Sequence, residues 1–264
     1  MGLSLISYNH GHAAGQNTES KVAISLTAGV SEEITLAVTV TDRARRPVNG
    51  LAAANFAVFE DGKPQAIFAV SHEDGPVSIG LLLDSSGSTR EKRDFLMAAM
   101  LHLALIGNPG NEMFVVNFAD EPYMDLDFTS DLGLVRQALQ RGAARGGTAM
   151  YDAVGAAAEH LKRSKYQKRA VVVVVADGPD NESRWSHKQA IQAAQYANGP
   201  AVYLLAIPDE HDSWRTNREL EELAKATGGI VMFPKNEKEL KAGVEQVMQQ
   251  IRSQYTITYK PENS

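Results

Sequence analysis

Three separate segments of this sequence carry side chains with oxygen donors, and together these side chains indicate a divalent-cation site. These side chains are Asp84, Ser86, Ser88, Thr148 and Asp177. Carboxylates and hydroxyls are hard ligands that suit magnesium, manganese or calcium, and magnesium is the metal we expect first. The sequence contains no cysteine, so thiolate zinc sites, disulfides and cysteine catalysis are excluded.

The alternation Asp84-x-Ser86-x-Ser88 suits a chain that turns sharply away from the end of a strand. Alternate residues then point toward one centre, and Gly87 eases the turn. Two carboxylates, Asp84 and Asp177, offset the charge of a divalent cation, while the other donors are neutral hydroxyls. We therefore expect a bound metal to stay electrophilic and to accept a carboxylate from a partner as its sixth ligand.

Each of the three segments also has an ordinary structural explanation when it is taken alone. Ser88 is a suitable cap for a helix that follows it, because serine is a preferred N-cap residue. Gly146-Gly147-Thr148 is typical of a loop and cap, and Asp177-Gly178 is typical of a plain turn. The order of the segments, each at the end of an expected strand or the start of a helix, favours the metal site.

From residue 77 onward, apolar strands alternate with helical patterns. The expected strands are Val77–Leu83, Met113–Phe118, Tyr123–Phe128, Ala170–Ala176, Ala201–Ile207 and Ile230–Phe233, and the expected helices are Arg90–Ile106, Asp131–Arg141, Ala149–Arg163, Ser186–Ala197, Asn217–Ala226 and Glu237–Arg252. This alternation predicts an α/β fold with a doubly wound, mostly parallel sheet that is covered on both faces. In such sheets ligands bind at the carboxyl ends of the strands.

The sequence before residue 76 has a different pattern. Ile34–Thr41 and Phe56–Glu60 alternate apolar and polar residues, and Asp61-Gly62 is a strong hairpin signal before Gln65–Val70. We expect a small appended β-module here. The last alternating run, Tyr255–Tyr259, should pair with this module, because the preceding helix returns to the end of the sheet that lies away from the site.

The predicted organisation has four parts. Residues 1–20 are a disordered leader or the remnant of a secretory signal, 21–75 the β-module, 76–253 the α/β domain and 254–264 the C-terminal strand. Both explanations of the leader stay open, because its apolar run Leu3–Tyr8 has no lysine or arginine ahead of it. No apolar stretch approaches the roughly 20 residues that a membrane-spanning helix needs.

The ordered motifs resemble the metal-ion-dependent adhesion site of von Willebrand factor type A domains, which also occurs in integrins. The resemblance rests on Asp84-x-Ser86-x-Ser88, Thr148 and Asp177-Gly178, and it covers about residues 77–253. It implies a Rossmann-like fold and metal-dependent protein binding, as in cell adhesion. The runs 38–65 and 147–154 resemble more specifically a bacterial group, the von Willebrand factor A-related proteins of acidobacteria. That group is usually exported, which implies a secreted or periplasmic location.

The resemblance also implies a role for each residue. Ser86 and Ser88 would contact the metal directly, Thr148 would do so directly or through water, and the two aspartates would often act through water. Ala176 departs from the family, in which threonine or serine commonly precedes the Asp-Gly pair. That position is not a ligand in the family, so the departure does not affect the predicted site.

Two tryptophans stand in loops that we expect beside the metal. Tryptophan is enriched in binding hot spots, so Trp185 and Trp214 are candidates for a rim that contacts a partner. The alternative is that each ring fixes its own loop to the body of the protein, because large rings are readily buried.

Other function classes have weaker support in the sequence. The net charge of −6 argues against a nucleic-acid partner. A phosphohydrolase of the haloacid dehalogenase type needs an acid two residues after its strand-end aspartate, and Ser86 stands there. We predict a protein that is not an enzyme and that binds an acidic group of a protein or extracellular ligand through its metal. A magnesium-dependent phosphohydrolase and a scaffold with a vestigial metal site remain as alternatives.

Overall fold

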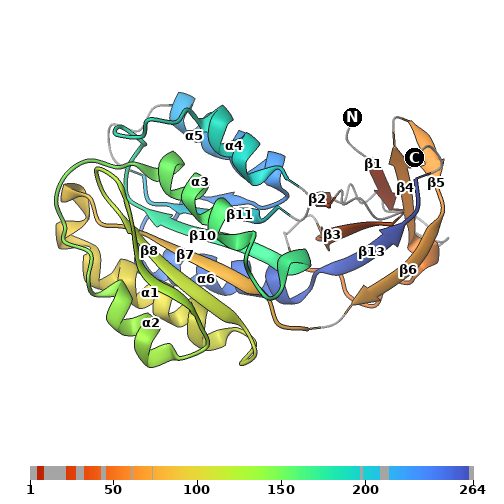
Figure 1. The fold of residues 1–264 in the computed structure, drawn as a ribbon, viewed down its shortest axis with the longest axis horizontal. Coiled ribbons are helices and arrows are strands. Elements are labelled where there is room, and N and C mark those ends of the chain that lie inside the picture. The colour runs from red at the N-terminus through yellow and green to blue at the C-terminus, as the bar shows by residue number, and fades with distance from the viewer. Residues whose placement is uncertain are drawn as a thin grey trace.

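The computed structural model of this chain describes residues 5–8, 22–27, 33–42, 46–60, 62–72, 74–196, 199–208 and 214–261. For residues 5–8, 22–27 and 214–216 it describes the backbone alone. Figure 1 shows an α/β domain with helices on both faces of its sheet, and beside it a smaller region built of strands.

A six-stranded sheet forms the centre of the α/β domain, with the order β12-β11-β10-β7-β8-β9. Its strands are β7 (Ser78–Asp84), β8 (Glu112–Phe118), β9 (Pro122–Thr129), β10 (Ala170–Ala176), β11 (Ala201–Ala206) and β12 (Val231–Met232). Neighbouring strands are parallel except β8 and β9, which are antiparallel. The predicted doubly wound, mostly parallel sheet is therefore confirmed.

Helices cover the sheet on both faces (Figure 1). They are α1 (Arg93–Ile106), α2 (Leu132–Leu139), α3 (Met150–Leu161), α4 (His187–Ala194), α5 (Trp214–Thr227) and α6 (Glu237–Arg252). Buried side chains of α1, α2 and α6 share one hydrophobic cluster, and those of α3, α4 and α5 share another. Short 3₁₀ helices lie at η1 (Ala53–Asn55), η2 (Gly87–Glu91) and η3 (Gln167–Arg169).

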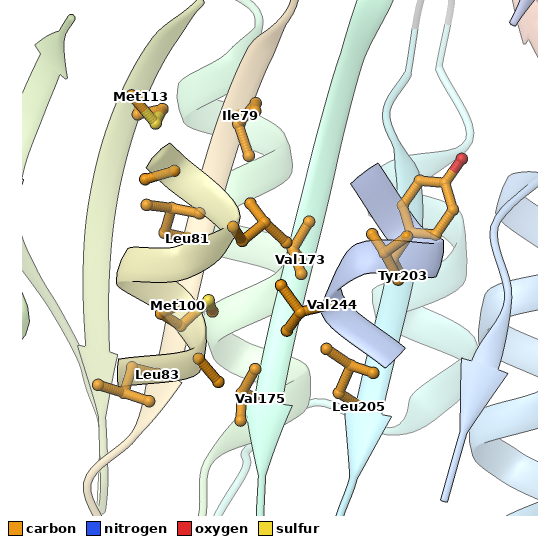
Figure 2. Packing of buried hydrophobic residues seen from close by; sticks show 14 of the residues in the cluster. Ile79, Leu81, Leu83, Met100, Met113, Val173, Val175, Tyr203, Leu205 and Val244 are labelled. Carbon is orange, nitrogen blue, oxygen red and sulfur yellow. The ribbon is translucent and has the colours of Figure 1, made fainter. Parts of the chain in front are cut away.

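The valine strand β10 shows why the sheet is buried on both sides. Val173 and Val175 pack in the cluster under α1 and α6, whereas Val172 and Val174 pack in the cluster under α3, α4 and α5. Figure 2 shows the first of these clusters around Val173 and Val175. Each fully buried valine contributes roughly 1.5–3 kcal/mol of hydrophobic stabilisation, so the strand ends are held on a rigid base.

The β-module consists of two small sheets. One has the order β1-β4-β5 and the other β2-β3-β13-β6. Their strands are β1 (Leu5–Tyr8), β2 (Val22–Thr27), β3 (Ile34–Val40), β4 (Phe56–Glu60), β5 (Lys63–Gln65), β6 (Ile67–His72) and β13 (Tyr255–Tyr259). Side chains of β3, β4 and β13 share a buried apolar cluster, so the two sheets have a common core.

The C-terminal strand lies inside this module. In β13, Ile257 is opposite Leu36 of β3 on one side and opposite Val70 of β6 on the other, and both pairings are antiparallel. The Tyr255 hydroxyl donates to Val48 O at 2.8 Å and accepts from Leu51 N at 3.1 Å. The predicted pairing of Tyr255–Tyr259 with the β-module is therefore confirmed.

The structure differs from the sequence expectations in the leader, at the start of α1 and at the start of α5. Leu5–Tyr8, expected within the leader, forms β1 and pairs with Phe56–Phe59 of β4, while residues 9–20 lie outside the described residues. The helix expected from Arg90 is divided into η2 and then α1, which begins at Arg93. None of the described helices has the length and apolar character needed to cross a membrane.

Candidate metal site

Two of the predicted ligands lie together because their strands are neighbours. In the parallel pair β7 and β10, Leu83 is opposite Val175, so both chains leave the sheet at the same edge. The backbone N–H of Asp177 points to Oδ2 of Asp84 at 3.4 Å. The two carboxylates thus occupy one buried centre at the carboxyl ends of the central strands.

The two serines extend this centre as a chain of hydroxyls. The Ser86 and Ser88 Oγ atoms are 3.0 Å apart, and the Ser88 hydroxyl donates to Asp177 Oδ1 at 2.7 Å. Because the Ser88 hydroxyl contacts Asp177, it does not cap the following helix. The residue before α1 is Lys92, which makes no side-chain capping bond. Asp84, Ser86 and Ser88 therefore point toward one centre, as the alternation predicts.

Asp84 is fully buried, and this burial dominates its electrostatics. Loss of solvation raises the pKa of the carboxyl from 3.8 to about 6. The charge of Asp177 adds to this rise, while hydrogen bonds from Ser86 oppose it. One of these bonds is the Ser86 N–H donating to Asp84 Oδ1 at 2.8 Å. The site holds a negative charge at neutral pH at an energetic cost.

Lys92 is part of this site, although its residue type and position were not among the predicted ligands. Its Nζ lies 3.0 Å from Asp177 Oδ2, and the Asp177 side chain is fully buried whereas that of Lys92 is 34 % exposed. The sequence held a weak signal for this contact: Lys92 follows Ser88 by four residues, about one helical turn. The buried carboxylate is therefore paired with an ammonium.

Thr148 comes from a separate loop that touches the first. The Gly87 N–H donates to Gly146 O at 3.0 Å, which joins the two loops. Thr148 is buried, and its N–H donates to Asn181 Oδ1 at 2.7 Å. Within the described part of the chain, it shares no hydrogen bond with the other four predicted ligands. A backbone hydrogen bond thus joins the loop that carries Thr148 to the loop that carries the serines.

Gly146 must be glycine for this loop to close, and we predict that Gly146→Ala destabilises the protein. Gly146 has φ +77°, and an added Cβ would lie 2.4 Å from Asp120 Oδ1, which accepts from the Gly147 N–H. We expect a loss of about 2 kcal/mol in the free energy of unfolding, measured in urea. Gly178→Ala is the matched control, since a Cβ there meets nothing within 4 Å. Equal stability of the two variants would contradict this account of the loop.

Trp185 lies against α3, where a helical glycine makes room for it. A Cβ on Gly155 would be 2.1 Å from Trp185 Cζ3, and the Trp185 N–H donates to Asp152 Oδ1 at 2.9 Å. The residue as a whole is nevertheless 40 % exposed. Trp185 therefore fixes its loop and also presents apolar surface. Trp214 was expected in a loop, but it is the first residue of α5, and its side chain lies outside the described residues.

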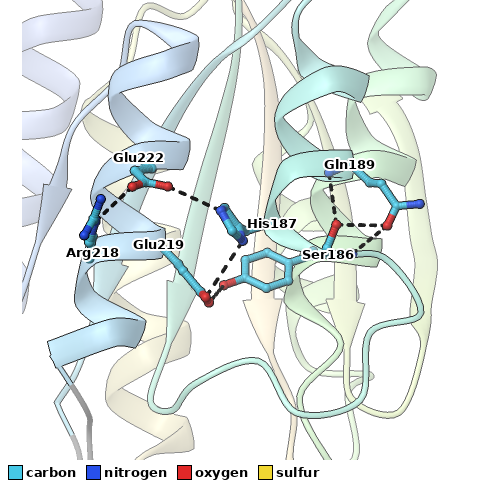
Figure 3. Close-up of polar contacts among 7 residues, drawn as sticks. Ser186, His187, Gln189, Arg218, Glu219 and Glu222 are labelled. Carbon is cyan, nitrogen blue, oxygen red and sulfur yellow. Dashed lines mark hydrogen bonds and ion pairs between the residues drawn. The ribbon is translucent and has the colours of Figure 1, made fainter.

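A second polar cluster joins α4 to α5, as Figure 3 shows. His187 Nδ1 is 3.9 Å from Glu219 Oε1, and His187 Nε2 is 3.3 Å from Glu222 Oε2. The Tyr151 hydroxyl donates to Glu219 Oε2 at 3.2 Å. His187 thus faces acidic side chains of the neighbouring helix, and its contacts are those of a residue that holds two helices together.

The candidate site relies on hydroxyls as much as on carboxylates. Among the residues that the structure describes, no group of three or more histidine or acidic side chains is arranged to hold a metal. Asp84 and Asp177 are the two carboxylates of this centre, so further ligands would have to be Ser86, Ser88 and Thr148 or water. This composition is poor for zinc and suitable for a hard cation.

Comparison with protein-family models gives a match over residues 79–179 to the von Willebrand factor type A domain. This segment of the chain is thus similar to a von Willebrand factor type A domain. All five predicted ligands lie within the matched residues. Domains of this type are often adhesion or protein-binding modules, commonly metal-dependent, and are typically not enzymes. A comparison with curated proteins finds no match.

Solved structures share the fold of this chain at low sequence identity. A von Willebrand factor type A protein from Catenulispora acidiphila has a TM-score of 0.56 and 17% identity over 93% of this chain and 52% of its own. Proximal thread matrix protein 1 of the mussel byssus, with a zinc-occupied metal-ion-dependent adhesion site, has a TM-score of 0.57 and 20% identity over 73% of this chain and 50% of its own. The PilB minor pilin of Streptococcus sanguinis has a TM-score of 0.54 and 12% identity over 92% of this chain and 80% of its own. The chain spans about half the length of the first two.

Proposed function

We propose that this chain binds an acidic group of a protein or extracellular ligand through a divalent cation held at the ends of β7 and β10. The observation that carries the proposal is the continuous contact from Ser86 through Ser88 to Asp177 beside buried Asp84. Magnesium is the cation we propose, with manganese and calcium as alternatives. The mussel matrix protein, whose site of this type holds zinc, supports a divalent cation in general.

The donor set fits a hard divalent cation. Two buried carboxylates supply negative charge, and the ammonium of Lys92 already lies at one of them, so this centre attracts positive charge. Ser86, Ser88 and Thr148 would hold the metal with neutral oxygens, and Asp84 and Asp177 would balance its charge. A metal held mainly by neutral donors keeps a strong attraction for a further carboxylate, which explains the preference for an acidic partner.

Binding has better support than hydrolysis. The position at which a haloacid dehalogenase-type hydrolase needs an acid is Ser86, and its hydroxyl contacts Ser88. The matched family and the matrix and pilin proteins of similar fold agree with a binding role. We also propose an exported bacterial protein of the von Willebrand factor A-related group, with Trp185 and Trp214 on the rim that meets the partner.

The metal is tested by calorimetry with magnesium chloride. We expect saturable binding in the parent protein and its loss in Asp84→Ala, because the variant lacks one of the two carboxylates of the site. Glu221→Ala is the control, since it removes an exposed carboxylate from α5 and should bind like the parent. Equal heats in the parent and in Asp84→Ala would contradict the metal site.

The partner chemistry is tested with two immobilised peptide libraries that differ in one residue. Each peptide of the first library carries one aspartate, and the matched peptide of the second library carries asparagine at the same position. We expect the protein to be retained on the aspartate library in magnesium and released by a chelator. Retention that ignores the chelator would indicate a scaffold with a vestigial site. Turnover of a generic phosphatase substrate in magnesium, lost in Asp84→Ala, would favour the phosphohydrolase instead.

A further inference from the structure

We infer that Lys92 is a built-in counter-ion of the metal site, which neutralises Asp177 when no metal is bound and keeps the affinity for divalent cations low. This inference rests on the proposed function, because it concerns the same site. It adds a specificity-determining residue outside the set of oxygen ligands. The observation behind it is the 3.0 Å contact between Lys92 Nζ and Asp177 Oδ2.

Both oxygens of Asp177 are engaged by donors from one short segment. Oδ1 accepts from the Ser88 hydroxyl at 2.7 Å, and Oδ2 accepts from Lys92. The Asp177 side chain is buried, and an unpaired charge in a buried position is costly. The pairing with Lys92 therefore stabilises the ionised carboxylate. The chain itself thus supplies a partner to each oxygen of Asp177, and the Lys92 ammonium offsets the charge of this carboxylate.

The backbone holds Lys92 at this position. Lys92 ends η2 and precedes α1, and its N–H donates to Thr89 O at 2.9 Å. The Thr89 hydroxyl in turn donates to Ser86 O at 2.8 Å. The next residue, Arg93, reaches elsewhere, to Ser85 Oγ at 2.9 Å and Leu139 O at 2.9 Å. Lys92 is therefore tied to the loop that carries the serine ligands, and its role differs from that of Arg93.

The pairing changes what an incoming cation meets. With Asp84 ionised, the two carboxylates and Lys92 give the centre one net negative charge, where the carboxylates alone would give two. A divalent cation must also displace the Lys92 ammonium or bind beside it, where repulsion between the two positive charges lowers its affinity. The side chain of Lys92 is 34 % exposed, so its ammonium can withdraw into water. Metal binding and the Lys92–Asp177 contact are thus competing states of one site.

The test is Lys92→Met, which keeps an unbranched side chain and removes the charge. We expect its magnesium affinity, measured by calorimetry, to be about tenfold higher than that of the parent, because repulsion of the cation is gone. Its metal-free form should unfold at a lower temperature than the metal-free parent, and saturating magnesium should remove that difference. Lys92→Arg retains the charge and should lack the tenfold gain.

The matched control is Lys168→Met, an exposed lysine in η3 just before β10, at the opposite end of the strand from Asp177. It should change neither quantity. If the parent binds magnesium and Lys92→Met binds it with equal or lower affinity, the role of Lys92 is overturned and the metal site is still supported. Absence of binding in both proteins, when both are folded, would overturn the metal site and this inference with it.

Discussion

Asp84→Asn is expected to be more stable than the parent at pH 7.5 without metal, by up to about 3 kcal/mol. The parent must keep a buried carboxylate ionised at this pH, although burial raises its pKa from 3.8 to about 6. Asparagine has no charge and keeps an oxygen for the Ser86 N–H. The same variant should lose magnesium binding, so the site trades stability for function.

The pH dependence gives the sign of this effect. The folded parent holds the Asp84 proton up to about pH 6, while the unfolded chain releases it near pH 3.8, so this group lowers stability as pH rises between these values. The advantage of Asp84→Asn should therefore fall to about half at pH 5. Urea unfolding in a chelator at both pH values measures it, with Glu221→Gln on exposed α5 as control. An advantage that does not change with pH would contradict the assigned cause.

Magnesium is expected to stabilise the folded parent and to leave Ser88→Ala almost unaffected. Binding to the folded state alone contributes about 2.7 kcal/mol when the metal is at 100 times its dissociation constant. The Ser88 hydroxyl lies between Ser86 and Asp177, so its loss removes one donor and interrupts the chain of contacts. Thermal unfolding over a magnesium series measures the shift.

Ser164→Ala is the matched control for this experiment. The Ser164 hydroxyl is buried and finds no hydrogen-bond partner among the described residues, and it follows α3 at the end of the domain away from the site. Its removal should leave the magnesium-induced shift at the parental value. A shift that survives in Ser88→Ala would show that the metal binds elsewhere or without this hydroxyl.

Much of the fold followed from local pattern. The valine run of β10 has no polar face, so it had to lie in the middle of a covered sheet, and its neighbours had to be parallel. Once the strands were known, the rule for strand ends brought Asp84 and Asp177 together without further information. The C-terminal pairing of Tyr255–Tyr259 followed from the direction of the preceding helix.

The remaining features depend on contacts between distant residues or on the exact winding of a turn. The Lys92 ammonium reaches Asp177 because η2 precedes α1, and the sequence pattern predicted one helix from Arg90. The position of the Trp185 loop depends on Gly155, which lies thirty residues earlier, in α3. The pairing of Leu5–Tyr8 with β4 joins segments whose own patterns do not specify a partner.

The position of β13 in the middle of its sheet has a mechanical consequence. The α/β domain is inserted between β6 and β13, so a pull on the metal site reaches the β-module through two covalent links, at Ser78 and at Arg252. The ion pair between Arg252 and Asp74 joins the two links beside the module. Tension is therefore shared between two anchors, the edge strand β6 and the interior strand β13, which pair with each other.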